Sequence, residues 1–99
     1  MARQAIWYGQ LTDEVLNGST PYRVRLSYGV FSIAPKVTQS GIYHYSLKRH
    51  KGRLYKHYVG KAGEIDAERL HQATMQLLHK IYVASGDYDL VDHRGREPQ

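Results

Sequence analysis

Side chains that could bind or catalyse gather in residues 41–64, which read GIYHYSLKRHKGRLYKHYVGKAGE. The imidazoles could transfer protons or ligate a metal, and the lysines and arginines could bind phosphate. Tyr55, among the cations, could stack on an exposed base or support the stems of lysine side chains. Within this stretch no carboxylate occurs before Glu64, so cations and aromatic rings are interspersed with no acid between them.

These residues do not predict a metal site or an active site. Zinc takes three or four ligands, and His44, His50 and His57 have neither a cysteine nor a nearby acid to complete a set. The stretch also lacks the carboxylates of a Ser-His-Asp triad or an acid pair, although a histidine with a tyrosine could transfer a proton. The GKAG segment at 60–63 lacks the full spacing of a phosphate-binding loop. We therefore predict a protein that is not an enzyme and uses no metal or cofactor.

The charges of the chain are segregated along the sequence. Between Val15 and Gly63 there are nine cations and no acid, a charge of +9, whereas the remaining residues have five cations and nine acids, a charge of −4. Solubilising surfaces usually mix both signs. A uniformly positive segment suits a nucleic acid, an anionic membrane surface or an acidic protein.

Length and composition predict one domain with no membrane span. The 99 residues leave little room for a second core, and no apolar run approaches the roughly 20 residues of a membrane helix. The first ten residues lack the apolar segment of a signal peptide, which predicts a cytoplasmic protein. We place the domain in residues 1–86 and a flexible tail in residues 87–99.

Residues 22–28, YRVRLSY, alternate apolar and polar side chains, which predicts a half-buried strand. The apolar residues after Gly29 continue with the opposite parity, so we expect a bulge there and a strand over 22–33. Pro35 predicts the end of this strand, and the residues after it predict a loop. Residues 3–16 fit a helix or, in their first half, a strand.

Residues 42–49 and 54–60 predict a β-hairpin with its turn at Lys51-Gly52, because glycine supplies the positive φ of a tight turn. Counting back from the turn places Tyr45 opposite Tyr58. One face then collects Tyr43, Tyr45, Leu47, Leu54 and Tyr58, and the other collects His44, Ser46, Lys48, His50, Arg53, Tyr55 and His57. We expect the first, more apolar set beneath a helix and the second set in solvent.

A helix is predicted over residues 66–83, with Asp66 as its N-cap and Gly86 beyond its end. Its apolar stripe consists of Leu70, Ala73, Leu77 and Ile81, widened by Met75 and Leu78. The predicted fold class is therefore α+β, a three-stranded antiparallel sheet packed on one C-terminal helix. The N-terminal segment is of uncertain structure.

Two resemblances rest on these patterns. The spacing of Gly41, Tyr43, Tyr45 and Leu47, followed by a glycine turn and the series YVGKA before a helix, resembles small bacterial proteins linked to mobile elements. The architecture over residues 22–82 resembles the arm-type DNA-binding domain of tyrosine recombinases, which implies an open sheet face in the major groove. The groove-facing positions implied are Arg23, Arg25, Lys48, His50, Arg53 and Tyr55.

We expect a nucleic-acid-binding protein, with double-stranded DNA favoured over RNA, that acts as a regulator or accessory factor and is a monomer or homodimer. The alternative is a module that docks an acidic protein through the same surface. Lysines at the turn and strand edges are expected to contact phosphates, and two arginines, Arg25 and Arg53, to contact bases. The predicted binding residues are Arg23, Arg25, Lys48, His50, Lys51, Arg53, Tyr55, Lys56, His57 and Lys61.

Overall fold

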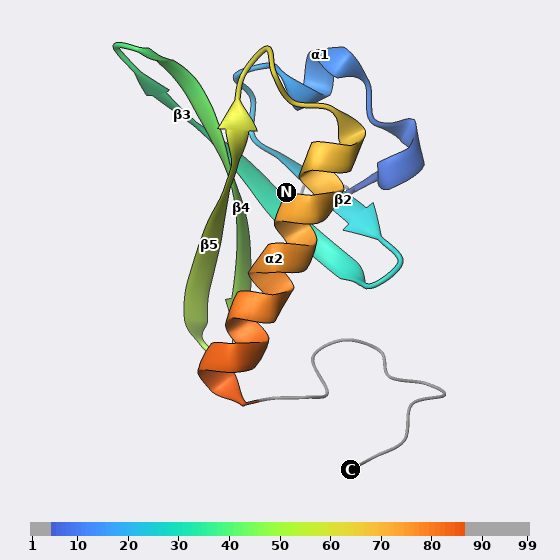
Figure 1. The fold of residues 1–99 in the computed structure, drawn as a ribbon. Helices are drawn as coiled ribbons and strands as arrows, with labels where there is room; N and C mark the ends of the chain where they lie inside the picture. Colours follow the sequence, from blue (N-terminus) through green and yellow to red (C-terminus); the bar gives the residue numbers. More distant parts are fainter. Residues whose placement is uncertain (1–4, 87–99) are drawn as a thin grey trace.

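The computed structural model describes residues 5–86, which form a mixed five-stranded sheet and one long helix (Figure 1). The strands lie in chain order: β1 (Ile6–Trp7), β2 (Tyr22–Leu26), β3 (Gly29–Thr38), β4 (Gly41–His50) and β5 (Arg53–Lys61). Only the β1–β2 pair is parallel. The segments η1 (Tyr8–Gln10) and α1 (Asp13–Leu16) precede β2, and α2 (Ala67–Ser85) follows β5. The α+β class is confirmed, but the three-stranded antiparallel sheet is wrong in detail. The predicted tail lies outside the described residues.

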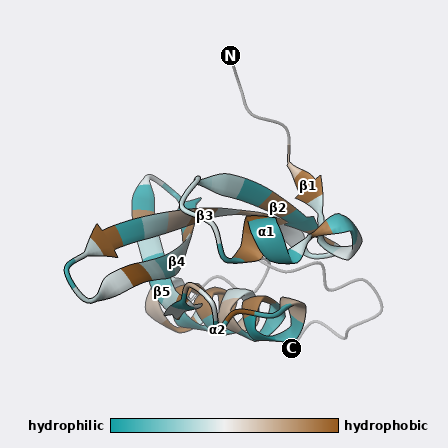
Figure 2. Cartoon of the chain, turned by 90° about the horizontal axis from the view of Figure 1, so that it is seen from above, coloured by the Kyte–Doolittle hydropathy of each residue, from teal (hydrophilic) through white to brown (hydrophobic). Residues whose placement is uncertain are grey.

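Helix α2 covers one face of the sheet, as Figure 2 shows in a view along the sheet. The Asp66 carboxylate accepts the backbone N–H of Arg69 at 2.8 Å, and Gly86 ends the helix with a φ of 70°, as predicted. Met75 is 45% exposed and does not belong to the apolar stripe. The core of sheet and helix consists of Tyr22, Val24, Leu26, Phe31, Ile33, Val59, Leu70, Ala73, Leu77, Leu78 and Ile81.

The single strand predicted over 22–33 is wrong, because the chain reverses direction between β2 and β3. Leu26 pairs with Gly29 and Tyr22 pairs with Ile33, so the change of parity reflects a tight turn rather than a bulge. The strand also continues through Pro35 to Thr38. Since β2 begins opposite Ile33, β3 has only β4 beside it at Pro35, where a missing N–H donor is tolerated.

The predicted β4–β5 hairpin is confirmed, including its register. Tyr45 pairs with Tyr58, and both turn residues have positive φ, 52° at Lys51 and 80° at Gly52. The pairing shifts where His44 meets Gly60, which makes Val59 an extra residue in β5. Because of this bulge, the side chain of Lys61 lies on the same face of the sheet as that of Tyr58.

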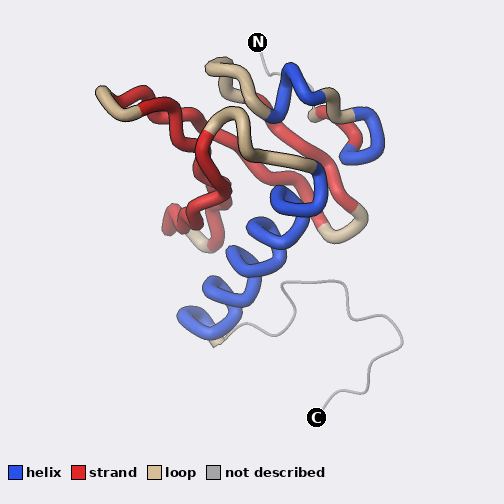
Figure 3. The backbone as a smooth tube through the Cα atoms, turned by 45° about the horizontal axis from the view of Figure 1, so that its top comes forward, coloured by secondary structure: helices blue, strands red, loops and turns tan. Residues whose placement is uncertain are grey.

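The N-terminal segment packs beside the start of α2 (Figure 3). It contains both elements that its sequence allowed, a two-residue strand and a four-residue helix. The Tyr8 hydroxyl donates to the carbonyl oxygen of Ala67 at 2.8 Å, and the Asn17 amide donates to the carbonyl oxygen of Ile65 at 2.9 Å. These contacts hold the segment to the loop and first turn of the helix.

Candidate functional site

Strand pairing decides which side chains share each face of the sheet. Ile33 is buried beneath α2 and pairs with Ser46, so the hairpin residues on the Ser46 side also face the helix. His44 and Ser46 are both fully buried, at 0% exposure. We call the opposite side the open face; it carries Trp7, Arg23, Arg25, Val30, Ser32, Ala34, Lys36, Tyr43, Tyr45, Leu47, Arg49, Leu54, Lys56, Tyr58 and Lys61.

The predicted orientation of the hairpin is therefore wrong, although its two sets of side chains are separated as predicted. The tyrosine-rich set was expected under the helix because it is the more apolar one. β4 is hydrogen-bonded to β3, however, and the core positions of β3 fix which side of β4 faces the helix. Small residues on that side also leave room for close packing: a Cβ added to Gly60 would lie 3.1 Å from Cγ1 of Ile65.

Five predicted binding residues consequently lie on the helix side of the hairpin. Lys48 donates from Nζ to the carbonyl oxygen of Val30 at 3.1 Å, and burial lowers its pKa. His57 donates from Nε2 to Oε1 of Gln76 at 2.8 Å. These contacts join the hairpin to β3 and α2. The five residues are Lys48, His50, Arg53, Tyr55 and His57.

Tyr55 packs against the edge of the core, with Cζ of Arg53 at 5.5 Å from its ring centroid. Tyr55 therefore does not lie on the solvent side of the sheet, where it was expected. Lys51 lies in the exposed turn between the two strands.

The other predicted cations lie on the open face, where several sit beside aromatic rings. Nζ of Lys56 is 5.2 Å from the Tyr45 ring centroid, and Nζ of Lys61 is 6.0 Å from that of Tyr43. At the far edge of the sheet, Cζ of Arg25 is 5.6 Å from the Trp7 ring centroid. Cations within about 6 Å of a ring are attracted by its electron-rich face. The four predicted residues on this face are Arg23, Arg25, Lys56 and Lys61.

Three tyrosines on the open face were absent from the predicted site. The Tyr58 ring centroid lies 5.6 Å from that of Tyr45 and 6.4 Å from that of Tyr43. Tyr58 is 45% exposed. Their period-2 spacing was visible in the sequence, but the residues were assigned to the core. Only the pairing of β4 with β3 places them outside.

Paired residues form rows across the open face. One row holds Lys36, Tyr43 and Lys61, the next holds Ala34, Tyr45 and Tyr58, and the third holds Arg23, Ser32, Leu47 and Lys56. Successive rows are two residues apart along β3 and β4, or about 7 Å, and the bulge at Val59 makes the step from Tyr58 to Lys61 three residues on β5. An aromatic row thus lies between two rows that carry cations, and strands β2 to β5 contain no acid.

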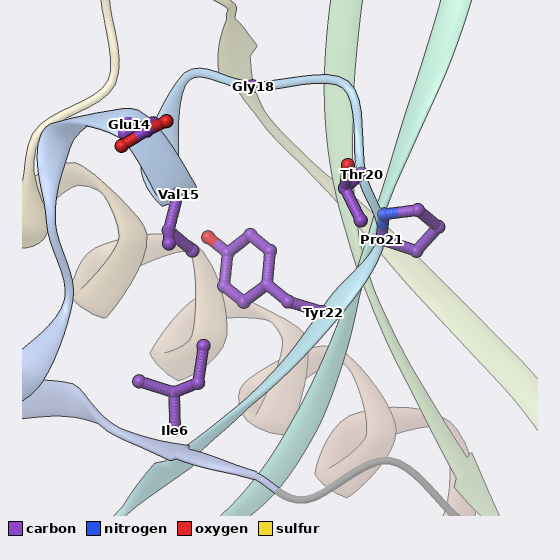
Figure 4. A pocket seen from close by; sticks show the side chains of 7 residues that line it. All are labelled: Ile6, Glu14, Val15, Gly18, Thr20, Pro21 and Tyr22. Carbon is purple, nitrogen blue, oxygen red and sulfur yellow. The ribbon is translucent and has the colours of Figure 1, made fainter.

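A separate cleft of about 390 Å³ lies between the N-terminal segment and the start of β2 (Figure 4). Its lining is mostly apolar, and Glu14 is the one charged residue in it. The Tyr22 ring extends into the space between Val15 and Ile6, but its hydroxyl is buried. A single carboxylate beside apolar side chains offers no paired groups for acid–base chemistry.

Within residues 5–86, no group of three or more histidines and acids is placed to hold a metal ion. The helices in the same range are too short or too polar to cross a membrane. Comparison of the chain with protein-family models, curated protein sequences and solved structures found no match. The resemblances to mobile-element proteins and to recombinase arm-binding domains therefore stay predictions.

Proposed function

We propose that this chain binds nucleic acid through its open face and is not an enzyme. The observation that carries the proposal is the composition of that face, which combines cations and exposed aromatic rings without a carboxylate. Cations supply affinity for phosphates and aromatic rings supply contacts to bases or sugars. The acids near the start of α2, which are Glu64, Asp66 and Glu68, follow the last strand and lie outside the sheet.

Binding to an unrelated duplex DNA at low salt is the direct test, measured by gel shift or fluorescence anisotropy. We expect Lys56→Gln and Lys61→Gln each to weaken binding and to lower the slope of log affinity against log salt by about one. Lys80→Gln is the matched control, since it removes the same charge from α2, where Nζ of Lys80 donates to the carbonyl oxygen of Lys56.

Two results would count against the proposal. If wild-type protein binds neither duplex nor single-stranded probes, the open face is better explained as a docking surface for an acidic protein. If Lys80→Gln weakens binding as much as Lys56→Gln, while hydrogen exchange at β5 is unchanged in Lys80→Gln, net charge rather than this face governs affinity.

A further inference from the structure

We infer that the open face takes unpaired bases, so that the substrate class is single-stranded nucleic acid. The inference rests on the proposed function and concerns the same surface. Its basis is the cluster of Tyr43, Tyr45 and Tyr58, whose rings lie on the solvent side of the sheet. The sequence alone favoured double-stranded DNA, when these rings were expected in the core.

The tyrosine rings meet edge to face or tilted, and they do not stack face to face. Tyr58 is inclined by 64° to Tyr45 and by 41° to Tyr43, so the three rings do not form a closed stack. Stacking on an exposed ring needs a base whose face is free, and in a duplex neighbouring base pairs cover those faces. An unpaired base can remove both its own face and the tyrosine ring from water.

The side chains of β3 beside Tyr45 and Leu47 are small. Ala34 shares the row of Tyr45 and Tyr58, and Ser32 shares the row of Leu47. On the β3 side of Tyr45, the neighbouring side chains are therefore small. A base could therefore approach the ring cluster from the middle of the sheet.

The cations flank the cluster on both sides, as a backbone that crosses it requires. Lys61 lies in the row on one side of Tyr58 and Lys56 in the row on the other. Their flexible stems can leave the rings of Tyr43 and Tyr45 and contact phosphates while a base takes the aromatic surface. The sheet face thus offers aromatic contacts at its centre and phosphate contacts on both sides of them.

The experiment compares a fluorescent oligothymidylate with a duplex of the same length. We expect wild-type protein to bind the oligothymidylate more tightly. Tyr58→Leu should weaken oligothymidylate binding about five- to a hundred-fold, the range for loss of one stacking contact, and leave duplex binding nearly unchanged. Tyr58→Phe keeps the ring and should bind like wild type. Tyr82→Leu, on α2, is the matched control for removing a tyrosine elsewhere.

The results separate this inference from the proposed function. Tighter binding to the duplex, or equal losses on both probes in Tyr58→Leu, would overturn the stacking inference while nucleic-acid binding stands. Binding to neither probe would overturn both. An unchanged affinity of Tyr58→Leu for oligothymidylate, with its fold intact by circular dichroism, would also exclude stacking on this ring.

Discussion

His44 is the buried group through which pH should act most directly on stability. Its side chain is fully buried, and Nε2 donates to the carbonyl oxygen of Gly18 at 2.8 Å, which leaves Nδ1 unprotonated in the neutral ring. Among residues 5–86, Nδ1 has no hydrogen-bond partner. Burial lowers the pKa of His44 because it disfavours the imidazolium, and the bond to Gly18 only partly opposes this effect.

Because burial lowers the pKa of folded His44, the protein should become less stable as the pH decreases. Below the unfolded pKa of about 6.5, the unfolded chain binds a proton that the folded chain resists, so the free energy of unfolding falls as pH decreases. His44→Gln can still donate to Gly18 but does not titrate. We expect denaturant titrations from about pH 7.5 to pH 5 to show a smaller loss in the variant. Equal pH profiles would mean that His44 titrates alike in the folded and unfolded states, so that burial does not lower its pKa.

Tyr22 carries a buried hydroxyl that finds no hydrogen-bond partner in the described part of the chain. Burial also raises its pKa well above the usual value, because the phenolate is even harder to desolvate. Tyr22→Phe should therefore raise the free energy of unfolding by about 1 kcal/mol. The control is Tyr28→Phe, which removes a 2.7 Å hydrogen bond to Thr74 and should be destabilising. Destabilisation by Tyr22→Phe would show that its hydroxyl has a partner.

At the scale of elements, the β4–β5 turn is the place where backbone conformation limits the residue type. Both turn residues have positive φ, which fits a type I′ turn, and Lys51 is poorly suited to that conformation. Asparagine tolerates it better, so Lys51→Asn should stabilise the protein by up to about 1 kcal/mol in thermal or denaturant unfolding.

Gly52→Ala provides the matched control for the turn. A Cβ there meets no atom within 4 Å, so any loss of stability, expected at about 1 kcal/mol, reflects backbone conformation alone. If neither variant changes stability, the turn does not hold the hairpin in this conformation.

At the scale of the whole molecule, Asn17 joins segments that are distant in sequence. Its Oδ1 accepts the backbone N–H groups of Gly63 at 2.7 Å and Ile65 at 3.0 Å, and its Nδ2 donates to the carbonyl oxygen of Ile65. The side chain thereby holds the N-terminal segment to the loop that starts α2.

Asn17→Ala should lower the free energy of unfolding by about 1–3 kcal/mol, because it leaves partly buried backbone groups without partners. Hydrogen exchange at the amides of Gly63 and Ile65 should become faster. Asn17→Asp keeps the acceptor and should lose less protection at these two amides. Unchanged exchange in Asn17→Ala would show that the loop is held by other contacts.

Local patterns in the sequence were sufficient to predict several elements of the fold. Alternation, a glycine turn and a capped apolar stripe predicted the hairpin with its register and the C-terminal helix, since these features depend on neighbouring residues and on backbone preferences. The β2–β3 reversal was missed because a turn without an obvious signal resembles a bulge when only parity is considered. The predicted strand ended too early, at Pro35, because the sequence does not show that Pro35 lies beyond the start of β2, where only β4 pairs with β3.

The sequence by itself determined that the strands are rich in cations and lack acids, and which hairpin side chains share a face. It did not determine which of the two faces meets α2. That choice depends on long-range pairing: Phe31 and Ile33 belong to the core, β4 pairs with β3, and the side that carries His44 and Ser46 must follow. Only the tertiary structure therefore places the tyrosines in solvent beside Lys56 and Lys61, because both faces of the hairpin mix aromatic or apolar side chains with polar ones and neither stands out as the buried face.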